Sequence, residues 1–94
     1  MILEWSDDAL ADLERFADFL HHKHPALAPI IAREIITKSE VLIRHPKLGK
    51  PIAGHGEFRQ VVLEVLNAPY VFQYRFDGAR LVMLRVFHGR ETRE

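Results

Sequence analysis

The sequence predicts an α+β fold in which an N-terminal strand and a two-helix antiparallel hairpin pack on a small antiparallel sheet, in the order β-α-α-β-β-β. Two observations lead to this prediction. Between residues 7 and 44, apolar residues recur at spacings of three and four, which is the period of a helix. Between residues 58 and 88, three segments rich in β-branched and aromatic residues are separated by turn residues, which is typical of strands.

The first strand is expected at residues 2–5, and Ser6 is expected to cap the helix that follows it. This helix should end at Lys23 or His24, because Pro25 follows. Its apolar stripe, expected to face the core, consists of Ala9, Leu10, Leu13, Phe16, Ala17 and Leu20. The side chains expected to face water are Asp12, Arg15, Asp18 and His22.

The second helix is expected to begin at Pro25 or Ala26 and to run to Arg44. His45-Pro46 should stop it, because a residue that precedes proline disfavours the helical conformation. The link between the two helices is short, so they should pack as an antiparallel hairpin. Residues 46–56 are rich in glycine and proline and are expected to form a loop.

Three strands follow, at residues 58–66, at residues 70–76, and from residue 80 to residue 87 or 88. Residues 67–69 and the Asp77-Gly78 pair supply the turns, so the strands should form an antiparallel meander. With the helices on one face, the other face of the sheet should be open.

Side-chain alternation predicts which residues of the sheet share a face. On the middle strand, one face should carry Tyr70, Phe72, Tyr74 and Phe76, and the other Val71, Gln73 and Arg75. On the last strand, Arg85 should share its side with Leu81, Met83 and Phe87. An arginine among apolar residues needs an exposed face or a buried ion pair. Its structural role, and that of Arg59, would be to pair with Glu57 or Glu64.

Composition indicates one small domain, residues 1–94, with a thin core. The chain has no cysteine, which excludes a disulfide framework and a cysteine-based zinc site and fits a reducing cytoplasm. No apolar run approaches the ~20 residues that span a bilayer, and the N-terminus lacks the features of a signal peptide. We therefore expect a cytoplasmic protein with no membrane contact.

The net charge of zero hides an asymmetry between the two halves of the chain. Residues 1–40 carry eight acids and four bases, whereas residues 41–94 carry nine bases and five acids. The second half is therefore the better candidate for binding an anionic partner. We expect no metal, because His21, His22 and His24 cannot all face one ion from a single helix, and no cofactor, because no phosphate-binding loop is present.

The chain also resembles a known family, the RelE/ParE superfamily of toxins from type II toxin-antitoxin modules. The likeness covers nearly the whole chain, and the residues that carry it are Trp5-Ser6, Ala9, Asp12-Leu13, His45-Pro46, Gly49, Phe58-Arg59, Tyr70 to Tyr74 and Leu84 to Arg90. The resemblance implies the fold described above, a role in plasmid stabilisation and a cognate antitoxin as partner. It leaves homodimer formation open.

The superfamily divides between toxins that cleave messenger RNA in the ribosome and toxins that poison DNA gyrase. The nucleases carry lysines and arginines on the sheet, but here Val71 follows Tyr70 where they have an arginine, and residues 61–63 contain no lysine pair. A site without those cations would stabilise the charge at a scissile phosphate poorly. The chain is therefore more similar to the ParE branch, which implies inhibition of DNA gyrase rather than an enzymatic activity.

Two alternatives remain open. A ribosome-dependent mRNA endoribonuclease would use Arg59, His88 and Arg90 as its catalytic residues, with the ribosome and mRNA as partners. A degenerate member of the family would only bind an antitoxin. In any of these cases, the residues expected to bind the target or the antitoxin are Arg59, Tyr74, Arg85, His88 and Arg90.

Overall fold

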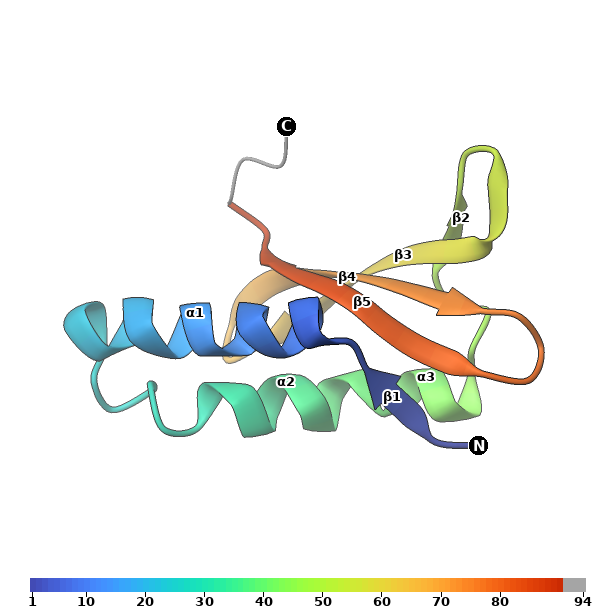
Figure 1. Cartoon of the computed structure of the whole chain (residues 1–94). Helices are drawn as coiled ribbons and strands as arrows, with labels where there is room; N and C mark the ends of the chain where they lie inside the picture. The colour runs from blue at the N-terminus through green and yellow to red at the C-terminus, as the bar shows by residue number, and fades with distance from the viewer. Residues whose placement is uncertain (91–94) are drawn as a thin grey trace.

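A computed structural model describes residues 1–90, apart from the side chain of His55. In chain order, its elements are β1 (Leu3–Trp5), α1 (Asp7–Lys23), α2 (Ile31–Ser39), α3 (Val41–Arg44), β2 (Lys50–Ile52), β3 (His55–Val65), β4 (Ala68–Phe76) and β5 (Leu81–His88). Figure 1 shows α1 and α2 antiparallel to each other on one side of the sheet, with the other side uncovered. This arrangement confirms the predicted α+β class.

The five strands form one sheet in the order β1-β5-β4-β3-β2. The meander of β3, β4 and β5 is antiparallel, as predicted. The sheet is nevertheless mixed, because β1 pairs in parallel with β5, and Leu3 lies opposite Leu81. A further strand, β2, occupies part of the predicted 46–56 loop and pairs with β3, so this part of the loop prediction is wrong.

The first helix has the predicted bounds. The Ser6 hydroxyl accepts a hydrogen bond from the amide of Ala9 at 3.1 Å, which is the predicted N-cap. The second helix begins later than predicted and is interrupted at Glu40, although the helical segment ends at Arg44 as predicted. Residues 25–30 form turns, so α2 begins at Ile31, and α2 ends at Ser39. The hydroxyl of Ser39 donates to the carbonyl of Ile36 at 2.8 Å, a local bond that competes with the helix ladder.

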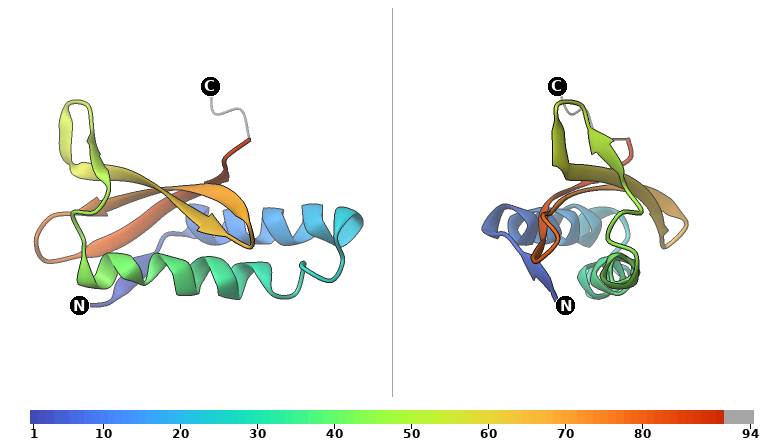
Figure 2. Two further views of the ribbon diagram at one scale, coloured as in Figure 1. Left: turned by 180° about the vertical axis from the view of Figure 1, so that it is seen from behind. Right: turned by 90° about the vertical axis from the view of Figure 1, so that its right-hand side faces the viewer.

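The core lies between the two helices and the face of the sheet that they cover. Its largest fully buried side chains include Phe72 and Tyr74 of β4, as the alternation on that strand predicted. The cluster of buried residues is completed by Ala9, Leu13, Phe16, Ile31, Ile35, Leu42, Val65, Tyr70, Leu81, Met83 and Val86. Figure 2 shows the helices end-on beneath the sheet that closes this core.

A β-bulge interrupts the alternation on β5. Gln73 pairs with Arg85, whereas the next residue of β4 pairs with Met83, so Leu84 is an extra residue. The bulge moves Arg85 to the face opposite Met83 and Leu81, which remain buried in the core. The prediction that Arg85 shares their side is therefore wrong, because simple alternation does not survive an inserted residue.

The carboxylate of Asp12 lies at this bulge, and it joins α1 to β5. Asp12 is only 3% exposed. It accepts hydrogen bonds from Nε and Nη2 of Arg85 at 2.9 and 3.0 Å, from the amide of Val86 at 2.8 Å and from Arg15 at 3.0 Å. Asp12 was expected to face water, and this expectation is wrong because the side of α1 that carries it faces the edge of β5.

The side chains of α1 cover the part of the β5 edge that β1 does not reach. The amide of Ser6 donates to the carbonyl of Met83 at 3.0 Å, and the hydroxyl of Ser6 donates to the carbonyl of Leu84 at 3.0 Å. Arg15 donates to the carbonyl of Val86 at 3.4 Å. Polar side chains of the helix therefore replace a neighbouring strand, and Asp12, rather than Glu57 or Glu64, is the acid that pairs with Arg85.

A second polar anchor fastens the segment after α3 to the sheet. The hydroxyl of Tyr74 donates to the carbonyl of Pro46 at 2.7 Å and accepts from the amide of Gly49 at 2.8 Å. Gly49 is required there, because a Cβ would lie 2.8 Å from that hydroxyl oxygen and 2.9 Å from the carbonyl oxygen of Gln60. Burial raises the pKa of Tyr74, so the hydroxyl keeps its proton for this contact.

The Asp12 contact makes a testable prediction about acid stability. Burial alone would raise the pKa of Asp12, but the hydrogen bonds from Arg85, Val86 and Arg15 outweigh it and lower that pKa. The carboxylate thus stabilises the fold fully above the pKa of an unfolded aspartate, about 3.9, and this contribution is lost as the pH falls through the lower folded value. We expect Asp12→Asn to reduce the free energy of unfolding by about 2 kcal/mol or more at pH 7.

Urea unfolding of the wild type and Asp12→Asn between pH 7 and pH 2 measures this difference, which should shrink below about pH 4. Asp18→Asn is the matched control, because Asp18 is an exposed acid on the same helix. Equal effects of the two substitutions at pH 7 would contradict the assigned role of Asp12.

The Tyr74 anchor makes a second prediction. Tyr74→Phe should reduce the free energy of unfolding by about 1–3 kcal/mol, because it leaves two backbone groups without their partner. Gly49→Ala should also destabilise the protein, but less in the Tyr74→Phe background, where the hydroxyl that a Cβ would strike is gone. A double-mutant cycle in urea measures this coupling, and strict additivity would count against the anchor.

Candidate functional site

The face of the sheet that the helices leave uncovered is the candidate functional surface, and we call it the open face (Figure 1). Cross-strand partners share a face of an antiparallel sheet, so the register defines its members. They are Phe58, Gln60, Val62 and Glu64 from β3, Pro69, Val71, Gln73 and Arg75 from β4, and Val82, Arg85 and Phe87 from β5.

The middle of the open face is apolar or neutral. Val71 lies between Val62 and Phe87, and the amide nitrogen of Gln73 donates to the side-chain oxygen of Gln60 at 2.9 Å. At the margins, cations contact neighbouring groups. Arg75 pairs with Glu57 at 3.2 Å and with Asp77 at 3.4 Å, and Arg80 pairs with Glu4 at 2.7 Å. The guanidinium of Arg85 lies 4.8 Å from the centre of the Phe87 ring and also binds Asp12.

Tyr74, one of the five expected binding residues, lies on the other face. Its side chain is fully buried under the helices, and its hydroxyl binds the backbone of Pro46 and Gly49. A side chain without exposed area offers a partner no contact, so Tyr74 is corrected here from a binding residue to a structural one. The sequence predicted that Tyr74 belongs to an aromatic stripe, but it did not predict that Tyr74 binds the loop at Pro46 and Gly49.

Arg59 lies opposite Tyr74 in the register and also turns toward the loop. Its Nη1 donates to the carbonyl of Gly49 at 2.7 Å and to that of Lys47 at 3.3 Å. Its Nε is buried and has no hydrogen-bond partner among the described residues. Nη1 of Arg59 is therefore occupied in holding the loop that joins α3 to β2.

His88 lies at the far end of the sheet, opposite Tyr70. The two rings meet edge to face with centroids 5.1 Å apart, and Nδ1 of His88 accepts from the amide of Arg90 at 3.1 Å. The amide of Gly89 donates to the carbonyl of Pro69 at 2.7 Å, which ties the end of β5 to the start of β4. The side chain of Arg90 is exposed.

These positions keep the expected catalytic set apart. Arg59 is level with Tyr74 and His88 with Tyr70, four positions away along β4, which corresponds to about 13 Å at the rise of a strand. Arg59 also faces the loop, whereas Arg90 lies beyond the end of β5. In residues 1–90, the three side chains proposed for the endoribonuclease alternative do not converge on one point.

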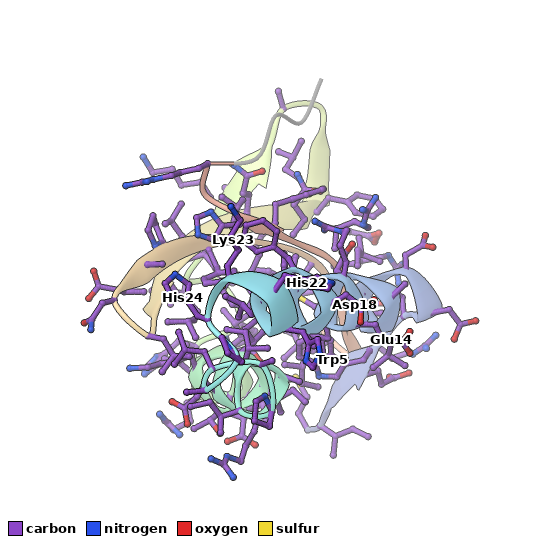
Figure 3. The ribbon with its side chains drawn as sticks, turned by 90° about the vertical axis from the view of Figure 1, so that its left-hand side faces the viewer. Trp5, Glu14, Asp18, His22, Lys23 and His24 are labelled. Carbon is purple, nitrogen blue, oxygen red and sulfur yellow. The ribbon has the colours of Figure 1, made fainter. Side chains whose placement is uncertain are left out.

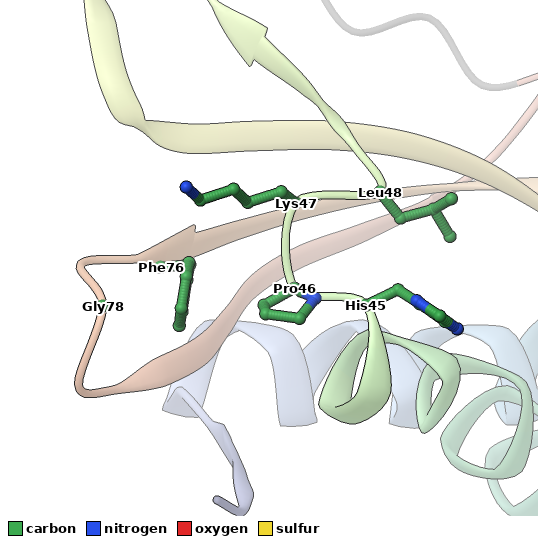
Figure 4. A pocket seen from close by; sticks show the side chains of 6 residues that line it. All are labelled: His45, Pro46, Lys47, Leu48, Phe76 and Gly78. Carbon is green, nitrogen blue, oxygen red and sulfur yellow. The ribbon is translucent and has the colours of Figure 1, made fainter.

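A pocket of about 660 Å³ lies between the loop and the β4–β5 turn and is lined by His45, Pro46, Lys47, Leu48, Phe76 and Gly78. Figure 4 shows the side chains of Lys47 and His45 pointing to opposite sides, so they do not form a common polar site. Figure 3 labels His22 and His24 at the end of α1, and both are exposed.

Within the described part of the chain, no three His, Cys, Asp or Glu side chains gather where they could hold a metal ion. None of the helices described there has both the length and the apolar character that crossing a membrane requires.

Sequence reasoning missed Asp12, although its position contained a signal. Asp12 is three residues after Ala9 and four before Phe16, both of which are buried, so it lies within the apolar stripe of α1. An acid in such a stripe needs a cationic partner. The last strand contains such a cation, Arg85, but it was expected to pair with Glu57 or Glu64 instead.

Comparisons with known proteins agree with this fold. Over 94% of this chain and 95% of the other, the structure matches a chain of the solved chromosomal ParDE TA system from P. aeruginosa, with a TM-score of 0.73 and 23% sequence identity. At this identity the match shows a shared fold. No curated protein matched the sequence. The family model described as ParE toxin of type II toxin-antitoxin system, parDE, matches residues 3–93. Because that match spans nearly all of the sequence, the chain belongs to the ParE toxin family of type II toxin-antitoxin systems.

Proposed function

We propose that this toxin acts in the cytoplasm by binding and inhibiting DNA gyrase, and that its cognate antitoxin neutralises it by direct contact. The observation that carries the proposal is that the arginines Arg59 and Arg85 bind groups of the protein itself. Arg59 holds loop carbonyls, and Arg85 binds the buried Asp12, so the two arginines lie on different faces and do not converge on one site. A toxin built in this way acts through the shape of its surface rather than by cleaving a phosphodiester bond.

The physical argument concerns charge in the transition state. Cleavage of RNA builds negative charge on a phosphate, and positioned cations stabilise that charge. The middle of the open face instead presents Val62 and Phe87, with Val71 buried between them, beside paired glutamines. Apolar and aromatic side chains with charges at the margin are typical of protein–protein contacts. The ribosome-dependent endoribonuclease is therefore the less supported alternative.

The end of β5 is the part of the candidate set that a partner can reach. Arg90 is exposed, and its amide donates to His88, which is half-buried. Arg85 is half-buried on the opposite face of the same strand. We assign to these three residues the contact with gyrase or antitoxin. Arg59 would contribute indirectly, by fixing the loop.

Purified toxin should inhibit the supercoiling of relaxed plasmid DNA by gyrase, and added antitoxin should restore it. Arg90→Ala should raise the toxin concentration needed for half inhibition by about tenfold, because it removes an exposed charge from the contact. Arg33→Ala is the matched control, since Arg33 is an exposed arginine on α2, and it should leave that concentration unchanged.

Transcripts from the arrested cells distinguish the alternatives. Cuts in ribosome-bound messages that disappear with Arg90→Ala, without any effect on supercoiling, would establish the endoribonuclease in place of the gyrase inhibitor. Normal growth during expression of the wild-type chain would identify a degenerate toxin that only binds its antitoxin.

A further inference from the structure

Each edge of a β-sheet presents unpaired backbone groups, and proteins usually block them. Three stretches of edge are blocked here. β1 has only three residues. The rest of the β5 edge is covered by side chains of α1, with Ser6 and Asp12 bound to its backbone. β2 carries Pro51, which has no amide to donate.

The outer edge of β3 is different. β2 accompanies β3 only up to the pair formed by Lys50 and Gln60, so residues 61–65 have β4 on one side and no strand on the other. In the described part of the chain, no backbone hydrogen bond from outside the sheet reaches them. Their sequence, Val-Val-Leu-Glu-Val, is strongly strand-forming. Figure 2 shows β3 along the outside of the sheet, with β2 beside its first part only.

A groove of about 510 Å³ lies between the start of β2 and the first two residues of this free edge, Val61 and Val62. Leu48 and Val62, which are 49% and 58% exposed, contribute to its lining, as do Ile52 and Val61. Lys50 is the one charged side chain that lines it. The edge therefore combines unpaired backbone, apolar side chains and a single cation at one end.

A second copy of the chain fits this edge poorly. If two β3 edges pair antiparallel about Leu63, Leu66 of the second copy comes level with Gln60, where Lys50 already lies. Leu66 and Asn67 form the turn into β4, with φ of 50° and 66°, so the second chain cannot bend away earlier. The next register avoids this collision but places the two Glu64 carboxylates opposite each other, which is repulsive.

A segment that is not part of a hairpin has neither problem. We propose that the edge formed by residues 61–65 of β3 binds an extended segment of the antitoxin as an added strand. This segment places apolar side chains against Leu48 and Val62 and a carboxylate near Lys50. The proposal rests on the antitoxin partner of the ParE family and is independent of whether gyrase is the target.

Amide hydrogen exchange of the full chain, alone and in complex with purified cognate antitoxin, tests the proposal directly. Amides of residues 61–65 that point away from β4 should exchange more slowly in the complex, by a factor of about ten or more, because they gain hydrogen-bond partners. Unchanged exchange across residues 61–65 in a saturated complex would overturn the proposal.

Val62→Glu tests the same edge by affinity. It places a carboxylate where the apolar groove meets an acidic segment, and it should weaken antitoxin binding by about tenfold or more in calorimetry. Ile2→Glu is the matched control, because Ile2 is 73% exposed beside β1, the opposite edge strand, and it should change the affinity by less than about threefold. Equal losses for the two variants would contradict the assignment.

Two further measurements keep the outcomes distinct. Sedimentation of the toxin alone should give a monomer, and a dimer that Val62→Glu dissociates would show that the edge joins two copies instead. A failure of the gyrase proposal would appear as normal supercoiling with the wild-type toxin, and it would leave the edge result unaffected, because exchange and calorimetry are measured with the antitoxin alone.

Discussion

The buried carboxylate of Asp12 is the contact on which the arrangement of helices and sheet depends. It binds Arg85, the Val86 amide and Arg15, and so attaches α1 to the last strand where β1 has ended. A carboxylate can remain charged in such a place only if several donors surround it. The β5 bulge belongs to the same arrangement, because it brings the guanidinium of Arg85 and the amide of Val86 to one carboxylate oxygen. The helical layer is thus positioned by polar contacts at an edge as well as by the core.

The same principle fixes the other end of the molecule. Tyr74 and Arg59 bind backbone groups of the loop at Pro46 to Gly49, and the small size of Gly49 lets the loop approach the sheet. Two of the five residues expected to recognise a target are therefore committed to this loop, and a third, Arg85, binds Asp12. The surface that remains for a partner consists of the neutral open face, the end of β5 and the free edge of β3. These features suit recognition of a protein better than chemistry on a phosphate.

The sequence predicted the class, the order of the main elements and the family, because periodicity, capping and turn residues act locally. It did not predict contacts that depend on distant parts of the chain. Asp12 resembles a solvent-facing residue until Arg85, 73 positions away, is placed beside it. The bulge at Leu84 leaves no mark on the apolar pattern of β5, and β2 is too short to give a periodic signal. Tyr74 was placed correctly in the aromatic stripe, but its role depends on a loop 28 residues earlier.

The central functional claim is that this ParE-family toxin acts through protein contact. Direct binding of the purified chain to immobilised gyrase and to immobilised ribosomes, each measured with and without the antitoxin, tests it most directly. The account predicts saturable binding to gyrase that the antitoxin prevents, and no comparable binding to ribosomes. Binding to ribosomes alone, prevented by the antitoxin, would contradict it.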